Sequence, residues 1–365
     1  MAVHSLLPAT SVPTVLAQPL ADGSVRCGVC AHRCLVRPGR HGICGVRENV
    51  DGVLVCHAYG AVAACGLDPI EKKPLFHVDP GSLSYSIATL GCPFHCRFCQ
   101  NWEIAQAPRL GLPVPTRPYS PGQVVDDARR AGARSIAYTY VEPTVFLEYA
   151  LDTARLARDA GLRNLFITDG YATPAAIELL GGVLDAANVD LKAFDDRFYR
   201  QLCGARLAHV LAAIVAMRTA GIWLELTTLV IPGWNDSDAE LQALTSWIVA
   251  TLGPTTPWHV SRFFPAHRML AVPPTSTSTL LRAAEIGRAA GLRHVYVGNA
   301  PALALEDTRC AGCGQVVIER RGYRTHSRLT IAGACPSCGR PLEGVGLART
   351  ADPVGVADPP GHDAR

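Results

Sequence analysis

The stretch Gly91-Cys92-Pro93-Phe94-His95-Cys96-Arg97-Phe98-Cys99-Gln100-Asn101-Trp102 contains three cysteines spaced Cys-x3-Cys-x2-Cys. Three thiolates on one short loop can converge on one soft metal centre. A [4Fe–4S] cluster ordinarily takes four cysteines, one per iron, so three leave one iron without a protein ligand. An open metal position is where substrate chemistry takes place. The preceding segment, Leu83 to Leu90, is bounded by Gly81 and Gly91 and is typical of a strand that delivers the loop to the end of a sheet.

This spacing resembles the signature of radical S-adenosylmethionine (SAM) enzymes. In that superfamily the open iron binds the amino and carboxylate groups of SAM, and the reduced cluster cleaves a carbon–sulfur bond to give a 5′-deoxyadenosyl radical. The resemblance implies that Cys92, Cys96 and Cys99 hold a [4Fe–4S] cluster and that SAM is the second cofactor. Phe98, directly before the last cysteine, matches a position that is often aromatic there and packs near adenine.

Length and composition set the broad class. The chain has 365 residues, of which 48% are hydrophobic and 18% charged, so it can bury a sizeable core. A formal net charge of +3 gives no reason to expect nucleic acid or an anionic membrane as a partner. No apolar run approaches transmembrane length, and no N-terminal signal pattern stands out. We therefore expect a cytoplasmic protein in a reducing compartment.

The 14 cysteines are grouped, which suits metals better than disulfides. An N-terminal group comprises Cys27, Cys30, Cys34 and Cys44, with glycines nearby that let the backbone fold tightly. Four thiolates can close a tetrahedral zinc site or bind a second iron–sulfur cluster. Both hypotheses stay open, beside the alternative that these are reduced thiols in an irregular loop.

A C-terminal group forms two Cys-x2-Cys pairs separated by 21 residues: Cys310, Cys313, Cys335 and Cys338. Two such knuckles, joined by an alternating segment, predict a closed four-thiolate site of the zinc-ribbon or rubredoxin-like kind. Zinc is the favoured metal because a closed site needs no open position, and a redox iron is the alternative. The intervening segment carries arginines that indicate a solvated face: Arg320, Arg321, Arg324 and Arg328.

From Ser84 to about Asn299, short β-branched or apolar runs alternate with alanine-rich amphipathic stretches. We predict strands at Ser84–Leu90, Ser135–Tyr140, Asn164–Thr168, Asn188–Leu191, Trp223–Ile231, Trp258–Phe263 and His294–Val297. Helices are predicted at Pro121–Ala131, Phe146–Ala160, Pro174–Leu180, Ala205–Ala220, Ser237–Thr251 and Thr279–Ala290, with Ser237 and Glu240 as a capping box. Four helices end in Ala-Gly, where glycine can close the last turn: Gly132, Gly161, Gly221 and Gly291. Such βα repeats build a parallel sheet.

The radical SAM resemblance implies that this sheet is a partial TIM-type (β/α) barrel of an α/β fold, with its site at the C-terminal ends of the strands. Polar residues just past strand ends are then the candidates. Glu142 follows the second strand, where many members carry a Gly-Gly-Glu motif whose acidic residue contacts the SAM amino group. Here Tyr140 and Val141 replace the two glycines, so only the glutamate carries over.

Further cofactor-binding candidates lie on two later strands. Asp190 and Lys192 share one face of the fourth strand because side chains alternate with a period of two. The pair closely resembles the Asp-x-Lys element of glycyl-radical-enzyme activating enzymes, which helps to hold SAM; a structural ion pair is the alternative. His259, on the sixth strand, is a candidate acid, base or ligand holder, or else a core histidine.

Residues 25–345 together resemble the AmmeMemoRadiSam-system radical SAM enzymes, relatives of the glycyl-radical activating enzymes such as pyruvate formate-lyase activating enzyme. The matching segments, besides both terminal cysteine groups, are Gly42–Arg47, Asp68–Ser82, Gly91–Trp102, Asp190–Phe194, Leu229–Asp236 and Arg262–Met269. That family name records association with two partner proteins and specifies no substrate. The resemblance also implies an electron donor such as flavodoxin or ferredoxin.

The chain is therefore divided into residues 1–82, a Cys-rich segment; 83–301, the barrel; 302–346, the four-cysteine ribbon; and 347–365, a disordered tail. The expected reaction is hydrogen abstraction by the 5′-deoxyadenosyl radical from an unidentified substrate, either a partner protein's backbone glycine, a small molecule or another protein side chain. A glycyl-radical activase proper is one alternative. A non-catalytic zinc-ribbon binding protein is another, although a three-cysteine loop does not close a tetrahedral zinc site.

Overall fold

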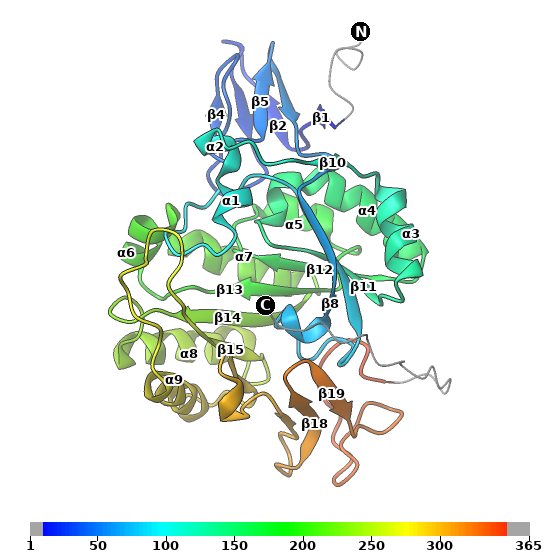
Figure 1. The fold of residues 1–365 in the computed structure, drawn as a ribbon, viewed down its shortest axis with the longest axis vertical. Coiled ribbons are helices and arrows are strands. Elements are labelled where there is room, and N and C mark those ends of the chain that lie inside the picture. The colour runs from blue at the N-terminus through cyan, green and yellow to red at the C-terminus, as the bar shows by residue number, and fades with distance from the viewer. Residues whose placement is uncertain (1–9, 349–365) are drawn as a thin grey trace.

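A central eight-stranded sheet dominates the computed structural model, which describes residues 10–348 (Figure 1). The strands lie in the order β16-β15-β14-β13-β12-β11-β9-β8. Their bounds are β8 (Ala64–Pro69), β9 (Leu83–Ala88), β11 (Ser135–Tyr138), β12 (Arg163–Thr168), β13 (Ala186–Asp190), β14 (Trp223–Val230), β15 (Trp258–Arg262) and β16 (Val295–Gly298). Strand β9 and strands β11 to β16 run parallel. The predicted α/β fold with a parallel sheet of the partial-barrel type is confirmed.

Strand β8 lies within residues 1–82, which the prediction assigns to the Cys-rich segment outside the barrel. It pairs antiparallel with β9, from Ala64 opposite Ala88 to Pro69 opposite Leu83. As an edge strand it buries few side chains, so its sequence lacks the apolar run that marks its neighbours. The N-terminal segment therefore contributes one strand to the central sheet.

Helices cover the sheet at nearly the predicted positions. They are α3 (Pro121–Arg130), α4 (Leu147–Asp159), α5 (Pro174–Leu180), α7 (Leu207–Thr219), α8 (Asp238–Leu252) and α9 (Thr277–Ala289), with short helices α1 (Trp102–Ala105), α2 (Ala107–Leu110) and α6 (Asp196–Phe198). The four predicted terminal glycines all adopt positive φ: Gly132, Gly161, Gly221 and Gly291. Glycine without a Cβ makes this left-handed turn at little cost, so each chain reversal starts where the sequence indicates.

The start of α8 is only partly as predicted. The Ser237 hydroxyl caps the helix by accepting from the Glu240 backbone N–H at 3.4 Å. The Glu240 carboxylate does not reach back and instead accepts from Phe194 N at 2.9 Å. This bond ties α8 to the loop after β13, a tertiary use of the residue that local patterning does not show. The complete capping box lies at α3, between Ser120 and Gln123.

The N-terminal residues form small antiparallel sheets at one end of the molecule, the top of Figure 1. Their strands are β1 (Val12–Pro13), β2 (Ala17–Pro19), β3 (Val25–Cys27), β4 (Leu35–Val36), β5 (Arg47–Val50), β6 (Val53–Cys56) and β7 (Ala61–Val62). Strand β7 pairs with β10 (Arg117–Pro118), which lies between α2 and α3. A buried ion pair joins them to α4, because the Arg47 guanidinium meets the Glu148 carboxylate at 2.7 Å. The two-residue length of several strands shows that these sheets depend on packing against the barrel.

The segment between β8 and β9, residues 70–82, is a plug that fills the interior of the barrel at the amino-terminal halves of the strands. Ile70, Leu75 and Val78 pack against inward-facing apolar residues of β11, β12 and β13. The backbone N–H groups of Phe76 and His77 donate to the buried Glu225 carboxylate at 2.9 and 2.7 Å. The interior is thus closed by protein at that end, which leaves the carboxyl ends of the strands for ligands.

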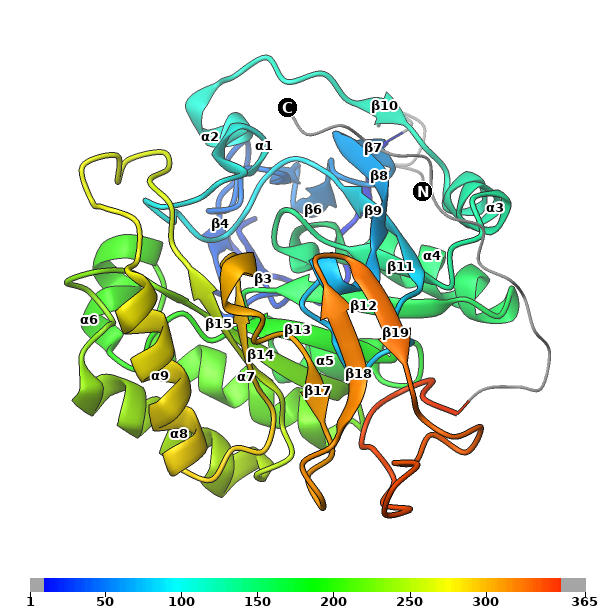
Figure 2. The ribbon, with the colours of Figure 1, turned by 60° about the horizontal axis from the view of Figure 1, so that its bottom comes forward.

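The C-terminal strands β17 (Thr308–Arg309), β18 (Val316–Arg321) and β19 (Arg324–Ser327) form a three-stranded antiparallel sheet, orange in Figure 2. Arg320 is buried, contrary to the predicted solvated face, since strand periodicity turns it inward together with Ile318. Its guanidinium donates to Phe76 O at 2.7 Å and lies 4.1 Å from the Phe76 ring centroid. The C-terminal module is therefore docked on the interior plug.

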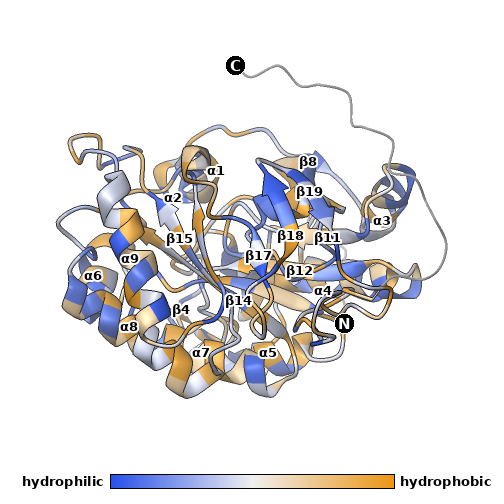
Figure 3. Cartoon of the chain, turned by 90° about the horizontal axis from the view of Figure 1, so that it is seen from below, coloured by the Kyte–Doolittle hydropathy of each residue, from blue (hydrophilic) through white to orange (hydrophobic). Residues whose placement is uncertain are grey.

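Hydrophilic and hydrophobic residues alternate along the peripheral helices α5, α8 and α9 in Figure 3, as expected of helices with one face on a core. Among residues 10–348, no single helix is long and apolar enough to cross a membrane; one bent pair, Asp196–Cys203 with Leu207–Thr219, meets that test by length and composition. Most of the predicted disordered tail, residues 349–365, lies outside the described residues.

Candidate active site

The loop after β9 places three sulfur atoms around one cavity. Cys92, Cys96 and Cys99 line a space of about 300 Å³ at the carboxyl ends of the central strands. Cys92 and Cys96 are buried, and Cys99 is partly exposed. The rest of the lining includes Phe98, Glu142, Asp169, Asp190, Lys192, Thr227, Ser261 and Asn299. Strand ends that are far apart in the sequence thus contribute to one space.

Backbone contacts hold the cysteine loop on both sides. His95 N donates to Cys203 O at 2.7 Å, which pairs the loop with the π-helical turn Tyr199–Cys203. On the other side, Gln106 Nε2 donates to Phe94 O at 3.0 Å. The loop shape is therefore set by hydrogen bonds that do not involve the three thiols lining the cavity.

Lys192 lies between two carboxylates at the cavity wall. Its Nζ is 2.8 Å from Asp169 Oδ1 and 2.7 Å from Asp190 Oδ2. Burial alone lowers the pKa of Lys192, but the two carboxylates outweigh it and hold that pKa well above its usual value. The lysine stays charged, and Asp190, with 39% of its side chain exposed, keeps an accessible carboxylate. The predicted pairing of Asp190 with Lys192 is present, with Asp169 added.

Glu142 is buried and held by its neighbours. Its carboxylate accepts from the Thr168 hydroxyl at 2.8 Å, from Asp169 N at 2.6 Å and from the Thr144 hydroxyl at 2.9 Å. Burial and the nearby Asp169 charge raise the pKa of Glu142 to about 7. The glutamate therefore joins the loops after β11 and β12, and the protein itself occupies much of its hydrogen-bonding capacity.

Tyr140 adopts a backbone conformation that favours glycine. Its φ is +64°, a left-handed value that costs an L residue about 1–2 kcal/mol. Its hydroxyl donates to Asp68 Oδ2 at 2.7 Å, and its carbonyl accepts from Asn101 Nδ2 at 2.9 Å. These contacts hold the strained turn in place next to the cavity, as strain at functional sites requires.

Phe98 lies where a flat ligand can pack. Its ring lines the cavity and is 5% exposed. Lys192 Nζ is 5.9 Å from its ring centroid, and Phe198 packs against it at 5.8 Å between centroids. The ring is thus fixed between the cysteine loop and the charged cluster.

Comparisons with known proteins agree with this geometry. The sequence model described as "Radical SAM superfamily" matches residues 86–244. An uncharacterized protein of Methanocaldococcus jannaschii, MJ0808, is 41% identical over 303 residues, which is 83% of this chain and 90% of that protein. This chain is a radical SAM superfamily enzyme.

The benzylsuccinate synthase activating enzyme of Thauera aromatica is 33% identical over 72 residues, 20% of this chain and 22% of that one. A radical SAM methyltransferase from Sphaerobacter thermophilus overlays with a TM-score of 0.48 at 20% identity, over 65% of this chain and 71% of that one.

The donor atoms of this radical SAM enzyme fit the cofactors of its superfamily. Three soft sulfurs face one cavity, and among the described residues no fourth cysteine lines it; Cys203 is buried beside Cys96 but outside it. Burial and the Asp169 carboxylate raise the pKa of the Cys92 thiol well above its usual value. Metal binding must therefore displace protons from these thiols. The exposed part of Asp190 leaves a polar contact for a second cofactor.

His259 does not line the cavity, which differs from its predicted place among the cofactor contacts. It faces the barrel interior from β15, but its Nε2 is 2.7 Å from Glu225 Oε2 and its ring packs on Phe76. The next inward-facing residue, Ser261, lines the cavity instead. The sequence places His259 on the correct face of the strand, but only the tertiary structure shows that the plug fills its layer.

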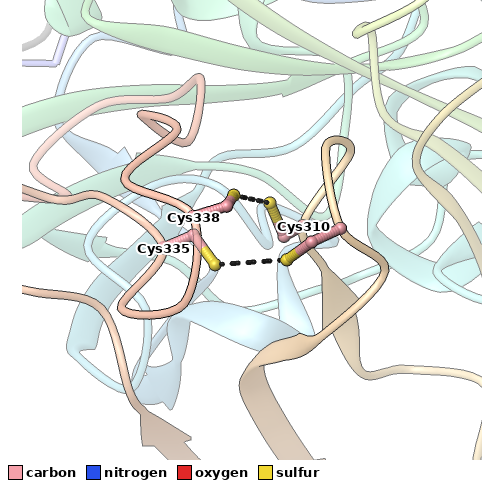
Figure 4. A group of neighbouring side chains, drawn as sticks. Cys310, Cys335 and Cys338 are labelled. Carbon is pink, nitrogen blue, oxygen red and sulfur yellow. Dashed lines mark hydrogen bonds between the residues drawn. The ribbon is translucent and has the colours of Figure 1, made fainter.

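The C-terminal cysteines form a compact cluster. Cys310 and Cys338 sulfurs are 3.5 Å apart, and Cys313 and Cys335 sulfurs are 3.6 Å apart, from two facing loops (Figure 4). All four sulfurs lie within 4.8 Å of one another. Thiolates about 2.3 Å from a tetrahedral zinc ion lie about 3.8 Å apart, so the donor set fits one zinc ion or one iron.

The N-terminal cysteines also face a common space. Cys27, Cys30, Cys34 and Cys44 line a small cavity that Val29, Val36 and Pro93 complete. Burial raises the pKa of each of these thiols. Pro93 is the neighbour of Cys92, so this cavity adjoins the loop that carries Cys92, Cys96 and Cys99.

Several residues of this wall are not among the site residues predicted from the sequence, and Asp169, Thr227 and Ser261 are three of them. Asp169 follows the third strand directly, and that position was the available signal for it. Thr227 and Ser261 lie inside strands, where polar residues facing a barrel interior cannot be told from structural ones by sequence. Thr227 and Ser261 line the cavity because the plug leaves their layers of the barrel interior open, which the sequence does not show.

Proposed function

We propose that Cys92, Cys96 and Cys99 hold a [4Fe–4S] cluster and that SAM binds beside it in the same cavity. The observation that supports this most is that the three sulfurs and the Asp169–Lys192–Asp190 cluster line one space. When bound, the cluster supplies the electron that cleaves SAM and yields a 5′-deoxyadenosyl radical. The resemblance to glycyl-radical activating enzymes supports the assignment of the Asp-x-Lys element to SAM.

The charged cluster gives SAM its orientation in this proposal. Lys192 is neutralised by two carboxylates, so the cluster carries net negative charge toward the cavity. SAM is a sulfonium cation with an ammonium and ribose hydroxyls, and carboxylates accept hydrogen bonds from the last two kinds of group. Asp190 is the exposed partner and therefore the direct contact, whereas Lys192 holds Asp190 in position. Phe98 provides an apolar face for adenine.

The size of the cavity bears on the substrate. Ligand pockets span about 300–1,000 Å³, and this one is at the lower limit with about 300 Å³. A SAM molecule leaves little room for a second whole molecule. A carbon radical must meet its target hydrogen at close range and away from water. We therefore propose that the substrate inserts only a short segment, as a loop of a partner protein would, with a backbone glycine as the target.

Partner proteins of the AmmeMemoRadiSam system are the first candidates, on the resemblance alone, and a flavodoxin- or ferredoxin-type protein is the proposed reductant. The similarity to the Thauera aromatica activating enzyme over 72 residues supports a protein substrate. The C-terminal cluster is proposed to hold zinc, since its four sulfurs close a single-ion site without an open position.

The test is an anaerobic assay of the iron–sulfur-loaded full chain with SAM and a reductant. We expect 5′-deoxyadenosine, in larger amounts when the substrate protein is added. If the partner is labelled with glycine deuterated at its α-carbon, one deuterium should appear in the 5′-deoxyadenosine. No SAM cleavage under any reductant contradicts the proposed function; cleavage without deuterium transfer contradicts only the glycine target.

A further inference from the structure

The N-terminal cysteines are placed by four separate pieces of backbone. Cys27 ends β3, Cys30 pairs as a bridge with Ala172, Cys34 directly precedes β4, and Cys44 lies in the turn before β5. All four residues line one small cavity, together with Arg47 and apolar neighbours. Four cysteines from four separate segments that line one space indicate a metal centre bound by their sulfurs.

Backbone N–H groups around this space hold the hairpin together and, at one position, point at a sulfur. Cys27 N donates to Cys34 O at 2.9 Å, which closes the β3–β4 hairpin. Ile43 N points at Cys34 Sγ, 3.5 Å away. Backbone N–H groups aimed at sulfur stabilise thiolate ligands and tune the potential of iron–sulfur clusters.

The spacing of the sulfurs distinguishes two kinds of metal. The C-terminal four all lie within 4.8 Å of one another, as ligands of one ion must. Within residues 10–348, the N-terminal cysteines do not form such a group, not even as a set of three. They nevertheless line one cavity. Ligands that share a centre but stand further apart than a single ion allows fit a cluster, whose thiolates bind different irons.

This cavity is built against the catalytic loop. The Arg109 guanidinium donates to Ile43 O at 2.6 Å and to Cys92 O at 3.2 Å, so it joins the two cysteine-bearing loops. His32 Nε2 is 3.0 Å from Pro93 O. A Cβ on Gly91 would lie 2.7 Å from Cys44 O, which shows how closely the loops approach. The two sulfur sets are therefore neighbours across Pro93.

We infer that Cys27, Cys30, Cys34 and Cys44 hold a second [4Fe–4S] cluster with all four irons ligated by protein. Such a cluster has no position for SAM. It is a separate redox centre beside the catalytic loop, reducible by one electron from dithionite or a protein donor. The inference rests on the N-terminal residues and does not depend on SAM cleavage.

The experiment compares four forms of the full chain, prepared and loaded with iron and sulfide under anaerobic conditions. They are the parent, the triple variant C92A/C96A/C99A, the quadruple variant C27A/C30A/C34A/C44A, and C65S as a control at an exposed cysteine outside all groups. Iron, sulfide and zinc are measured per chain. Electron paramagnetic resonance of dithionite-reduced samples, with and without SAM, separates the clusters, and circular dichroism checks that each variant is folded.

The parent and C65S should contain twice the iron and sulfide of either multiple variant. The triple variant should keep a reduced-cluster signal that SAM does not change, whereas the quadruple variant should keep one that SAM does change. If a variant misfolds, the iron content of the parent still tests the inference. A parent chain that contains the iron of only one cluster overturns it. A triple variant with a second zinc ion and no iron also overturns it. Loss of SAM cleavage with both clusters present contradicts the proposed function and leaves this inference standing.

Discussion

At the scale of single residues, Lys192 shows how charge is managed in a buried site. A lysine with two carboxylates within 2.8 Å is tolerated in the interior because the ions compensate one another. These three residues together carry one negative charge, and the same cavity is also lined by Lys72 and Lys73, which both pair with Asp68. Burying such a cluster costs desolvation free energy, but its carboxylates can contact a cationic cofactor.

Replacing Lys192 by methionine should weaken SAM binding at least tenfold and leave the iron content unchanged. It should also lower the free energy of unfolding by about 3–5 kcal/mol, because Asp169 and Asp190 are left facing each other unpaired. Equilibrium SAM binding and denaturant unfolding measure the two effects. R200A, which breaks an exposed ion pair with Asp196, is the control and should change neither by much. Undiminished SAM affinity in K192M contradicts the assignment.

The three cysteines of the loop make a second prediction at this scale. Changing Cys92, Cys96 or Cys99 singly to alanine should abolish SAM cleavage, because two anchors do not retain the cluster. The assay is 5′-deoxyadenosine formation together with iron content. C65S should retain full activity. Full cleavage in all three single variants would show that these sulfurs do not hold the catalytic cluster.

At the scale of elements, two glycines with positive φ have different roles, which an alanine substitution at each can separate. Gly132 and Gly91 both have positive φ, 70° and 93°. Nothing lies within 4 Å of a Cβ added at Gly132, whereas at Gly91 it would meet Cys44 O at 2.7 Å and Val46 at 2.8 Å. The first glycine serves backbone conformation alone, and the second also lets the N-terminal segment approach the loop that carries Cys92, Cys96 and Cys99.

The Gly132→Ala variant should therefore lose about 1–2 kcal/mol of stability, the cost of a left-handed L residue. The Gly91→Ala variant should lose more than that and should also bind less iron, since the cysteine loop and the Cys44 turn must move apart. Thermal unfolding and iron content are compared for the pair. Equal stability losses in the two variants, with parental iron in both, would contradict the close approach.

At the scale of the whole molecule, the C-terminal module and the interior plug form one connected structure. His77 contacts Glu343 O at 2.7 Å and the Tyr296 hydroxyl at 2.7 Å, and Arg320 reaches the plug at Phe76. Metal in the C-terminal cluster should therefore stabilise the barrel as well as the module. This coupling follows from the docking and not from the cysteine spacing.

Changing Cys335 and Cys338 together to serine should remove one zinc ion per chain and lower the melting temperature of the whole protein by several degrees. Iron bound by Cys92, Cys96 and Cys99 should remain, because none of the C-terminal cysteines lines their cavity. Zinc analysis and calorimetry test this. An unchanged zinc content or an unchanged melting temperature contradicts the prediction.

A buried histidine beside the plug predicts a pH dependence of stability: the ring of His294 lies 4.5 Å from the ring of His77. Burial lowers the pKa of His294 to about 3, well below the value near 6.5 of an unfolded histidine. A depressed pKa means that stability is fully present above about pH 6.5 and is lost as pH falls, at up to about 1.4 kcal/mol per pH unit. Between pH 7.5 and 5.5, H294F should lose about 1 kcal/mol less than the parent in denaturant unfolding. H326F, changed at an exposed position, should follow the parent.

The sequence alone determined much of the framework, because its signals are local. Apolar runs, Ala-Gly helix ends and the Cys-x3-Cys-x2-Cys spacing each depend on a few neighbouring residues, and the parallel strands, the terminal glycines and the three-sulfur cavity follow them closely. The Asp190–Lys192 pair is equally local, since a period of two puts both on one face.

Only the tertiary structure decided what depends on layers and edges. β8 is an edge strand without an apolar run, and Glu240 bonds to the loop after β13 in place of its own helix. His259 and Ser261 face the same interior, but the plug between β8 and β9 fills the layer of the first and leaves the second open to the cavity. Which interior position faces the cavity depends on how much of the barrel interior the plug fills. The plug is distant in sequence from these strands, so no local pattern contains that information.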